Sequence, residues 1–274
     1  VVGSCSLKTV STGGYNTSIG DRTLVDNTAD YNVAVGVLSS TENTTGTQNT
    51  AVGSVSLQSN TTADNNTALG YASLRCNTTA DNNTAVGFCS LYTNTTGNQN
   101  VAIGADALKA NTTASNNVAV GDDSLVANTT GTSNIAVGQG AMNTNTTGNC
   151  NISIGHRSMD LNTTGSRNTA VGKDAMRCNT TANDNTGFGF ESLNCNSTGV
   201  HNAAVGQALC KNTTGNCNIA VGSGALSSNT TASDNTAIGR SALSANTTGA
   251  YNTAVGCGSL KLNTTGQVNV AVGY

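Results

Sequence analysis

Two pairs of carboxylates have a spacing that could support glycoside hydrolysis. Asp106 and Asp123 are 17 residues apart, and so are Asp174 and Glu191. If 17 residues make one turn of a coil, each pair lies on neighbouring coils, near the carboxylate separation that retaining glycosidases use. The same columns of the sequence also carry cations such as Arg157, which is typical of a variable, solvated rim. We therefore expect no catalysis at these pairs.

Metal and redox chemistry have little support in the sequence. His156 and His201 are three coils apart and have no obvious partner, and neither zinc-type Cys/His spacing nor a calcium-binding nonapeptide repeat is present. Met142, Met159 and Met176 recur every 17 residues. We interpret them as flexible fillers of a core and expect no metal and no cofactor.

Cys178 and Cys195 are the two of the nine cysteines that occupy the same place in consecutive 17-residue units. Neighbouring coils would bring their Cα atoms to ~4.8 Å, inside the range that a disulfide requires. They are therefore a candidate disulfide, with free thiols as the alternative, because parallel side chains of one ladder often point the wrong way. The other cysteines are scattered, which argues against selection for a strongly oxidising compartment.

Asn-x-Thr/Ser sequons recur once in almost every unit, which makes N-glycosylation possible in a chain secreted by a glycosylating cell. The alternative is that Asn-Thr-Thr is simply a turn, with the Asn buried in a ladder that no glycan could enter. The candidate residues are Asn43, Asn60, Asn77, Asn94, Asn111, Asn128, Asn145, Asn162, Asn179, Asn196, Asn212, Asn229, Asn246 and Asn263.

All these residues belong to a 17-residue repeat that runs through the chain. The copy at 49–65 defines positions 1 to 17 of the consensus N-T-A-V-G-x-x-A-L-x-x-N-T-T-G-x-x. A fixed short period is the signature of a solenoid. Copies begin at Asn16, Asn32, Asn49, Asn66, Asn83, Asn100, Asn117, Asn134, Asn151, Asn168, Asn185, Asn202, Asn218, Asn235, Asn252 and Asn269.

The pattern within one copy predicts short strands joined by turns. It lacks a helical apolar stripe and suggests two strand-like pieces, at positions 1–5 and around positions 8 and 9. Glycine at position 5 indicates a positive φ or a close backbone approach. The aliphatic residues at positions 4 and 9 are expected to stack as the core. The Asn residues at positions 1 and 12 are expected to form amide ladders.

The turn at position 15 follows a rule of its own. Where position 15 is Ala, as at Ala63 and Ala80, position 16 is Asp, Ser or Asn. We expect that short polar side chain to bond the local backbone as an Asx-type turn.

The predicted fold is all-β, a parallel β-solenoid of about 16 coils with a 17-residue repeat. We expect residues 1–274 to form a single repeat array that starts and ends mid-coil, as a segment of a longer fibre would. Charged residues are 9% and the net charge is −3. There is no basic face for nucleic acid and no apolar run long enough for a membrane span.

The half-repeat Asn49-Thr50-Ala51-Val52-Gly53 resembles the Asn-Ser-Val-Ala-Ile-Gly repeat in the heads of trimeric autotransporter adhesins. The full unit resembles repeat arrays of phage and large-virus tail-fibre or surface-fibre proteins. The resemblance covers essentially the whole chain and implies a left-handed parallel β-roll, homotrimeric in the adhesins, that serves attachment.

From these observations we expect a structural, adhesive fibre or filament segment without enzymatic activity, at an extracellular location, on a cell surface or on a virion. Positions 3 and 4 are both apolar and face opposite ways, so one of them exposes an apolar strip that a homo-oligomer, a trimer above all, would cover. Cell-surface glycans or receptors would bind through a tip outside this segment. The alternatives are an ice-binding solenoid that uses the threonines at positions 13 and 14, and a tail-spike glycan hydrolase.

Overall fold

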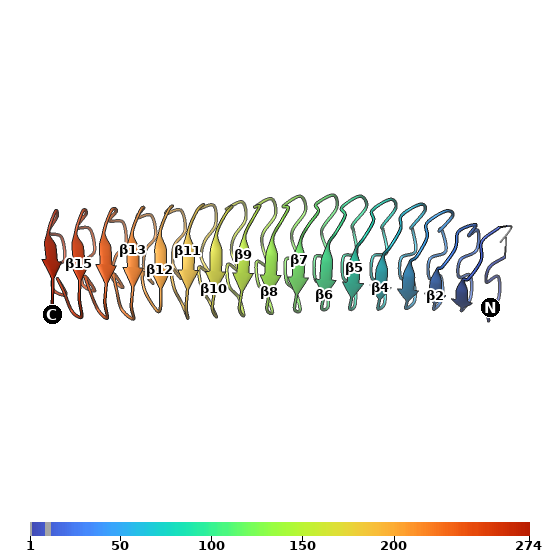
Figure 1. The fold of residues 1–274 in the computed structure, drawn as a ribbon, viewed down its shortest axis with the longest axis horizontal. Helices are drawn as coiled ribbons and strands as arrows, with labels where there is room; N and C mark the ends of the chain where they lie inside the picture. The colour runs from blue at the N-terminus through green and yellow to red at the C-terminus, as the bar shows by residue number, and fades with distance from the viewer. Residues whose placement is uncertain (1, 9–11) are drawn as a thin grey trace. The chain divides into compact units, whose positions relative to one another are not determined.

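The protein is an all-β parallel solenoid in a computed structural model that describes residues 2–8 and 12–274. The described residues form strands, turns, bends and irregular segments, without a helix. The chain forms two compact units, residues 1–134 and 135–274. In each of them every coil contributes one strand and returns through turns on the other side (Figure 1).

Every strand is three residues long and covers positions 2 to 4 of the repeat. The strands of the first unit are β1 (Thr17–Ile19), β2 (Val33–Val35), β3 (Thr50–Val52), β4 (Thr67–Leu69), β5 (Thr84–Val86), β6 (Val101–Ile103) and β7 (Val118–Val120). Those of the second are β8 (Ile135–Val137), β9 (Ile152–Ile154), β10 (Thr169–Val171), β11 (Thr186–Phe188), β12 (Ala203–Val205), β13 (Ile219–Val221), β14 (Thr236–Ile238), β15 (Thr253–Val255) and β16 (Val270–Val272).

Within each unit the strands pair in parallel and in register, one repeat apart. Val52 pairs with Val35 on one side and Leu69 on the other. In the second unit, Val171 pairs with Ile154 and Phe188 in the same way. The predicted 17-residue step is therefore confirmed.

The second predicted strand, around positions 8 and 9, is wrong. The segment forms consecutive turns in which positions 7 and 9 have left-handed backbone, as at Val55 (φ 52°) and Leu57 (φ 48°). Its N–H groups bond alternately to the two neighbouring coils: Val55 N–H to Val37 O at 2.9 Å, and Leu57 N–H to Ser73 O at 2.9 Å. A β-branched residue is disfavoured at positive φ, and position 9 is Leu or Met in every coil except at Ser40, although the half-buried position 7 carries Val55.

The core lies between positions 3 and 9, which corrects the expectation for position 4. Leu57 at position 9 and Ala51 at position 3 have no exposed surface. Leu69 at position 4 is 46% exposed. Because adjacent strand residues face opposite sides, only one of positions 3 and 4 can point inward. The inward one is alanine because a large side chain at position 9 already fills the narrow interior.

The coil at 185–201 shows how little room the interior leaves. Here position 3 is Gly187 instead of Ala. A Cβ on Gly187 would lie 3.1 Å from Cγ of Met176 and 2.8 Å from Oγ of Ser192. A methyl group at position 3 would therefore not fit in this coil as it stands, although Met142 and Met159 are followed by Ser153 and Ala170 at the same position.

Position 5 requires glycine for both of the expected reasons. Gly53 has a φ of 136°, and a Cβ there would lie 2.3 Å from the carbonyl oxygen of Gly70 in the next coil. Contacts under 3 Å with backbone cannot be relieved by a side-chain movement, so any other residue would separate the coils.

The two predicted asparagine ladders are confirmed, and in most coils they meet at one carbonyl. Asn66 at position 1 donates its backbone N–H to Oδ1 of Asn49 at 2.9 Å. Asn60 at position 12 donates from Nδ2 to Oδ1 of Asn43 at 2.7 Å. Both Asn49 and Asn60 also donate to the carbonyl of Ala63, at 2.7 and 3.1 Å. Most of the buried amides are thus satisfied by neighbouring coils and by their own turns, whereas the Nδ2 of Asn83 has no hydrogen-bond partner.

In the copies with Ala at position 15, the polar residue at position 16 acts between coils and not within its own turn, which corrects the Asx-turn expectation. Asp64 accepts the backbone N–H of Thr47 on its Oδ1 at 2.6 Å, and Asp81 accepts that of Asp64 at 2.8 Å. The side chain at position 16 therefore adds a further hydrogen bond between neighbouring coils.

The glycine requirement can be tested in one coil. Gly104 has a φ of 137°, and its Cβ would lie 2.5 Å from the Gly121 oxygen. We predict that Gly104→Val destabilises the fold by about 3 kcal/mol or more, whereas Ala105→Val, on the neighbouring rim position, changes it by less than about 1 kcal/mol. Denaturant unfolding of both variants measures the difference, and similar losses would contradict the role given to position 5.

The left-handed backbone at position 9 gives a second prediction. Leu108 is fully buried with a φ of 53°. Leu108→Ile and Leu108→Met conserve volume approximately, so both should cost less than about 1.5 kcal/mol if packing alone mattered. We expect the isoleucine variant to lose about 2 kcal/mol more than the methionine variant because of its branched Cβ. Equal midpoints in urea unfolding would refute this explanation.

Candidate functional site

The broadest surface with a chemistry of its own is the outer face of the strands, formed by the side chains at positions 2 and 4. No charged residue occupies either position in any coil. Ile103 is 40% exposed, Phe188 44% and Val205 45%. Within each unit this face is a flat, in-register array of Val, Ile and Thr side chains. Apolar faces of this extent are uncommon on soluble monomers and mark interaction surfaces.

A second regular file consists of the threonines at position 14. Thr62 and Thr96 are exposed, whereas Thr61 at position 13 is half-buried and donates its hydroxyl to the carbonyl of Thr78 at 3.1 Å. Only one of the two threonines in each turn therefore presents a hydroxyl to solvent. The other is part of the bonding between coils.

The four carboxylates of the hydrolase hypothesis lie on the rim at position 7. Asp106 forms an ion pair with Lys109, at 3.1 Å between Oδ1 and Nζ. Asp174 is buried beneath Arg157, at 3.2 Å. Glu191 instead accepts a hydrogen bond from Gln207 at 2.9 Å. Asp174 and Glu191 therefore have different partners although both are at position 7, as expected of a variable, solvated part of the coil.

Asp123 is the carboxylate whose pKa is raised on this rim. Partial desolvation raises it first, and the charges of Asp122 and Asp106 raise it further, while Lys109 lowers it. A general acid needs a raised pKa, but it also needs a partner that acts on the same substrate atom. The carboxylates whose charges act on Asp123 are those of Asp122 and Asp106, and Asp106 is itself paired with Lys109.

Cys178 and Cys195 lie on adjacent coils as predicted, and both thiols are free in this structure. Burial, followed by the neighbouring Cys195, raises the pKa of the Cys178 thiol. Cys210 on the next coil joins this group, because its carbonyl accepts the N–H of Cys195 at 3.0 Å. A thiol of raised pKa, such as that of Cys178, is less ionised at neutral pH and therefore less reactive, and the disulfide remains a prediction.

The sequon asparagines are the amide ladder at position 12. Asn111, for example, has no exposed surface and donates to Asn94 and to the Ala114 carbonyl, at 2.9 and 3.0 Å. Asn263 in the last turn is half-buried. A glycan on a buried member would remove it from the ladder and separate the coils. The folded coil therefore disfavours glycosylation and agrees with the alternative that Asn-Thr-Thr is a turn.

The remaining sequence candidates fall into two groups. Met142, Met159 and Met176 are fully buried in the core, whereas His156 and His201 are exposed on different coils. Among the described residues, no three His, Cys, Asp or Glu side chains are grouped so that they could hold a metal ion. No helix among them is long and apolar enough to cross a membrane.

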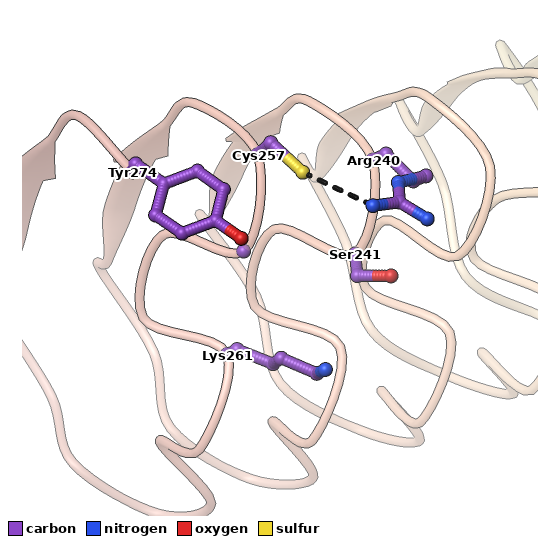
Figure 2. A pocket seen from close by; sticks show the side chains of 6 residues that line it. Arg240, Ser241, Cys257, Lys261 and Tyr274 are labelled. Carbon is purple, nitrogen blue, oxygen red and sulfur yellow. Dashed lines mark hydrogen bonds between the residues drawn. The ribbon is translucent and has the colours of Figure 1, made fainter.

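A pocket of about 360 Å³ lies on the rim near the C-terminus (Figure 2) and was not apparent from the sequence. Arg240, Cys257 and Tyr274 at position 6 form one wall, and Lys261 at position 10 stands opposite. Ser241 and Gly258 at position 7 complete the lining. Small residues at position 7 are the sequence signal that could have revealed it.

The pocket lies in a stretch where position 7 is small or missing. The coil at 202–217 has lost that residue, and Gly206 adopts a φ of 89° there instead of the 121–141° of the other position-5 glycines. Strands β12 and β13 nevertheless keep their register. The deletion is therefore absorbed in the rim and leaves the sheet unchanged.

In comparisons with known proteins, no family model matches the sequence, and no curated protein gives a significant match.

The raised pKa of Asp123 predicts how stability depends on pH. Its folded-state pKa lies above the ordinary value, so its contribution to stability is greatest below pH 3.8 and declines as pH rises through the folded pKa. We predict that Asp123→Asn raises the melting temperature slightly at pH 7, by about 1 °C.

Part of any gain comes from Asn itself, which tolerates the φ of 55° at this site, and that part is independent of pH. The gain should therefore be larger at pH 7 than at pH 3. Thermal melts at the two pH values measure it, and a gain that is equal at both would contradict the electrostatic cause.

Proposed function

We propose that this chain is a non-enzymatic structural segment of a fibre or filament, which self-associates through the outer face of its strands. The observation that carries the proposal is the exposed, charge-free array at positions 2 and 4. A strand that is apolar on both faces is normally covered on both. Here the inner face packs on the position 9 residues, and the outer face is open in the isolated chain.

The rest of the coil supports a structural role. The regularly repeated positions, which are 1, 3, 5, 9 and 12, form the core, the backbone contacts and the amide ladders. Variable residues lie on the rims. The residues that stack the coils are therefore the same in almost every repeat, whereas the surface residues vary. This distribution is expected of a repeat protein whose role is to provide length and to display its surface.

A second copy of the chain is the simplest cover for the outer face, because the two surfaces then have the same repeat along their length. A closed assembly would place identical faces around a common axis. The resemblance to adhesin heads favours a trimer and a location outside the cell or on a virion surface, where cell-surface glycans or receptors would bind at a tip. This part of the proposal rests on the repeat motif.

Self-association is tested with two variants in one coil. Val120 is at position 4 on the outer face, and Val126 is at position 10 on the rim. By sedimentation equilibrium at micromolar concentration, we expect the native chain and Val126→Glu to form the same oligomer and Val120→Glu to be a 27.3 kDa monomer. Circular dichroism checks that both variants fold.

A native chain that sediments as a monomer, or two variants that associate equally, would overturn the proposed interface. The fibre itself is tested separately by electron microscopy of the source organism or virus with antibodies against residues 100–250. Labelled filaments support it, and purely diffuse intracellular label contradicts it.

Ice binding is a second candidate, favoured by the regularity of two exposed surfaces. The outer face and the position 14 threonines both present uncharged, methyl-bearing side chains once per coil, at the ~4.8 Å spacing of parallel strands. A monomer with a free outer face would suit this function, whereas an oligomer would cover it. Thermal hysteresis at micromolar protein that is lost in Val120→Glu and kept in Val126→Glu would favour ice binding over the fibre.

A further inference from the structure

Three of the nine cysteines lie on consecutive coils in the middle of the second unit. Cys178 and Cys195 both occupy position 11, and Cys210 occupies position 10 of the next coil. The N–H of Cys178 bonds to the carbonyl of Asn194 at 2.9 Å, and that of Cys195 bonds to the carbonyl of Cys210 at 3.0 Å. The backbone therefore holds the three free thiols one coil apart.

These cysteines are not required by the stacking of the coils. At position 11 other coils carry residues as different as Ser59, Ala110 and Lys211. The core is filled instead at position 9, where Met176 and Leu193 have no exposed surface. The three thiols are half-buried, so a small ion can reach them without any opening of the coil.

Cys178 and Cys195 are the two thiols that interact directly. Burial raises the pKa of the Cys178 thiol most, the charge of Cys195 raises it next, and a hydrogen bond between the two side chains also contributes. The pKa of Cys210 is raised by burial and then by the charges of Glu191 and Cys195. The closest pair is therefore the one in which both members share position 11.

The spacing of this pair suits a metal ion between the two sulfurs. Equivalent side chains of neighbouring coils are ~4.8 Å apart. Two metal–thiolate bonds of about 2.3 Å each would span about 4.6 Å, whereas a disulfide requires the sulfurs to approach to about 2.05 Å. A bridging ion thus needs little movement of the stacked side chains.

The surroundings favour a soft ion that needs only two ligands. A structural zinc ion takes four ligands, and in the part of the chain that the structure describes no three His, Cys, Asp or Glu side chains are grouped to hold a metal ion. The neighbouring carboxylates already have partners: Asp160 pairs with Arg177 at 3.7 Å, and Glu191 accepts a hydrogen bond from Gln207 at 2.9 Å. Thiolates select Cu(I) among the common metals.

The charge of such a complex would be compensated locally. Two thiolates and one monovalent ion carry a net charge of −1. Arg177 precedes Cys178 in the sequence, and its charge favours the thiolate against the burial that raises the pKa of this thiol. The Nε of Arg177 is buried and has no hydrogen-bond partner. A cationic donor is therefore present beside the pair.

We propose that Cys178 and Cys195 bind one Cu(I) ion as a two-coordinate bis-thiolate. Both S–H bonds break, the two protons pass to the solvent, and two sulfur–copper bonds form without a change of oxidation state. The site lies on the rim, away from the outer face of the strands, so the proposal does not depend on self-association. The predicted disulfide would join the same two residues, and only the reduced chain can bind the ion.

The test measures Cu(I) binding by the whole, reduced chain in anaerobic competition with the chromophoric chelator bathocuproine disulfonate. Native mass spectrometry gives the stoichiometry. The variants are Cys178→Ser, Cys195→Ser and Cys210→Ser. Cys217→Ser, which removes an exposed thiol of the same unit, is the matched control for the loss of one cysteine. Each variant exchanges one sulfur for oxygen, and melting temperatures establish that all four fold.

We expect the native chain to hold one Cu(I) ion more tightly than any further one. Loss of a direct ligand costs more than loss of an outer partner, so Cys178→Ser and Cys195→Ser should each weaken that binding by about 100-fold or more, and Cys210→Ser and Cys217→Ser by less than about threefold. Three results would overturn the proposal: no complex with one ion that withstands the chelator, an equal loss in Cys217→Ser, or a loss in Cys210→Ser as large as that in Cys178→Ser, which would indicate a site of three thiols.

Discussion

Self-stacking is the constraint on which the whole structure depends. Each residue lies above and below its own equivalents, about 4.8 Å away, so a residue type is stable only if it tolerates copies of itself. Asparagine does, since its amide both donates and accepts, as Asn60 does between Asn43 and Asn77. A carboxylate does not, because like charges at this distance repel. Accordingly, charged residues are absent from positions 1–5, 8, 9 and 12–15 and lie on the rims.

The sequence was sufficient for the features that depend on period and residue type. It predicted a strand within positions 1 to 5, the glycine at position 5, both amide ladders and the core at position 9. It did not predict that Ala51 faces inward and Val52 outward. Strand alternation requires the two to face opposite sides, but the choice depends on the space left by Leu57 across the coil. The left-handed backbone at Leu57 was also missed, although the lack of β-branched residues at position 9 was a signal for it.

The candidate surfaces follow from the difference between the positions that stack the coils and the positions on the rims. The stacked positions are uniform, and they leave a uniform outer face that suits association with a copy of itself or with a regular lattice. The rims do not contribute to the core, so they can vary from coil to coil. The ion pair of Asp106, the thiols around Cys195 and the pocket at Arg240 are all rim features. The pocket could not be predicted from residue spacing, because it arises where side chains at position 7 are absent.

The central claim is that position 9 is inside the coil and position 4 is outside. Oxidative footprinting with peptide mass spectrometry tests it directly on the native chain, since Met142, Met159 and Met176 are fully buried and Leu69 and Phe188 are exposed. At a concentration below that of self-association, hydroxyl radicals should modify Leu69 and Phe188, while the three methionines should resist until the chain unfolds. Methionines that oxidise at the rate of the unfolded chain, together with protected Leu69 and Phe188, would contradict the account.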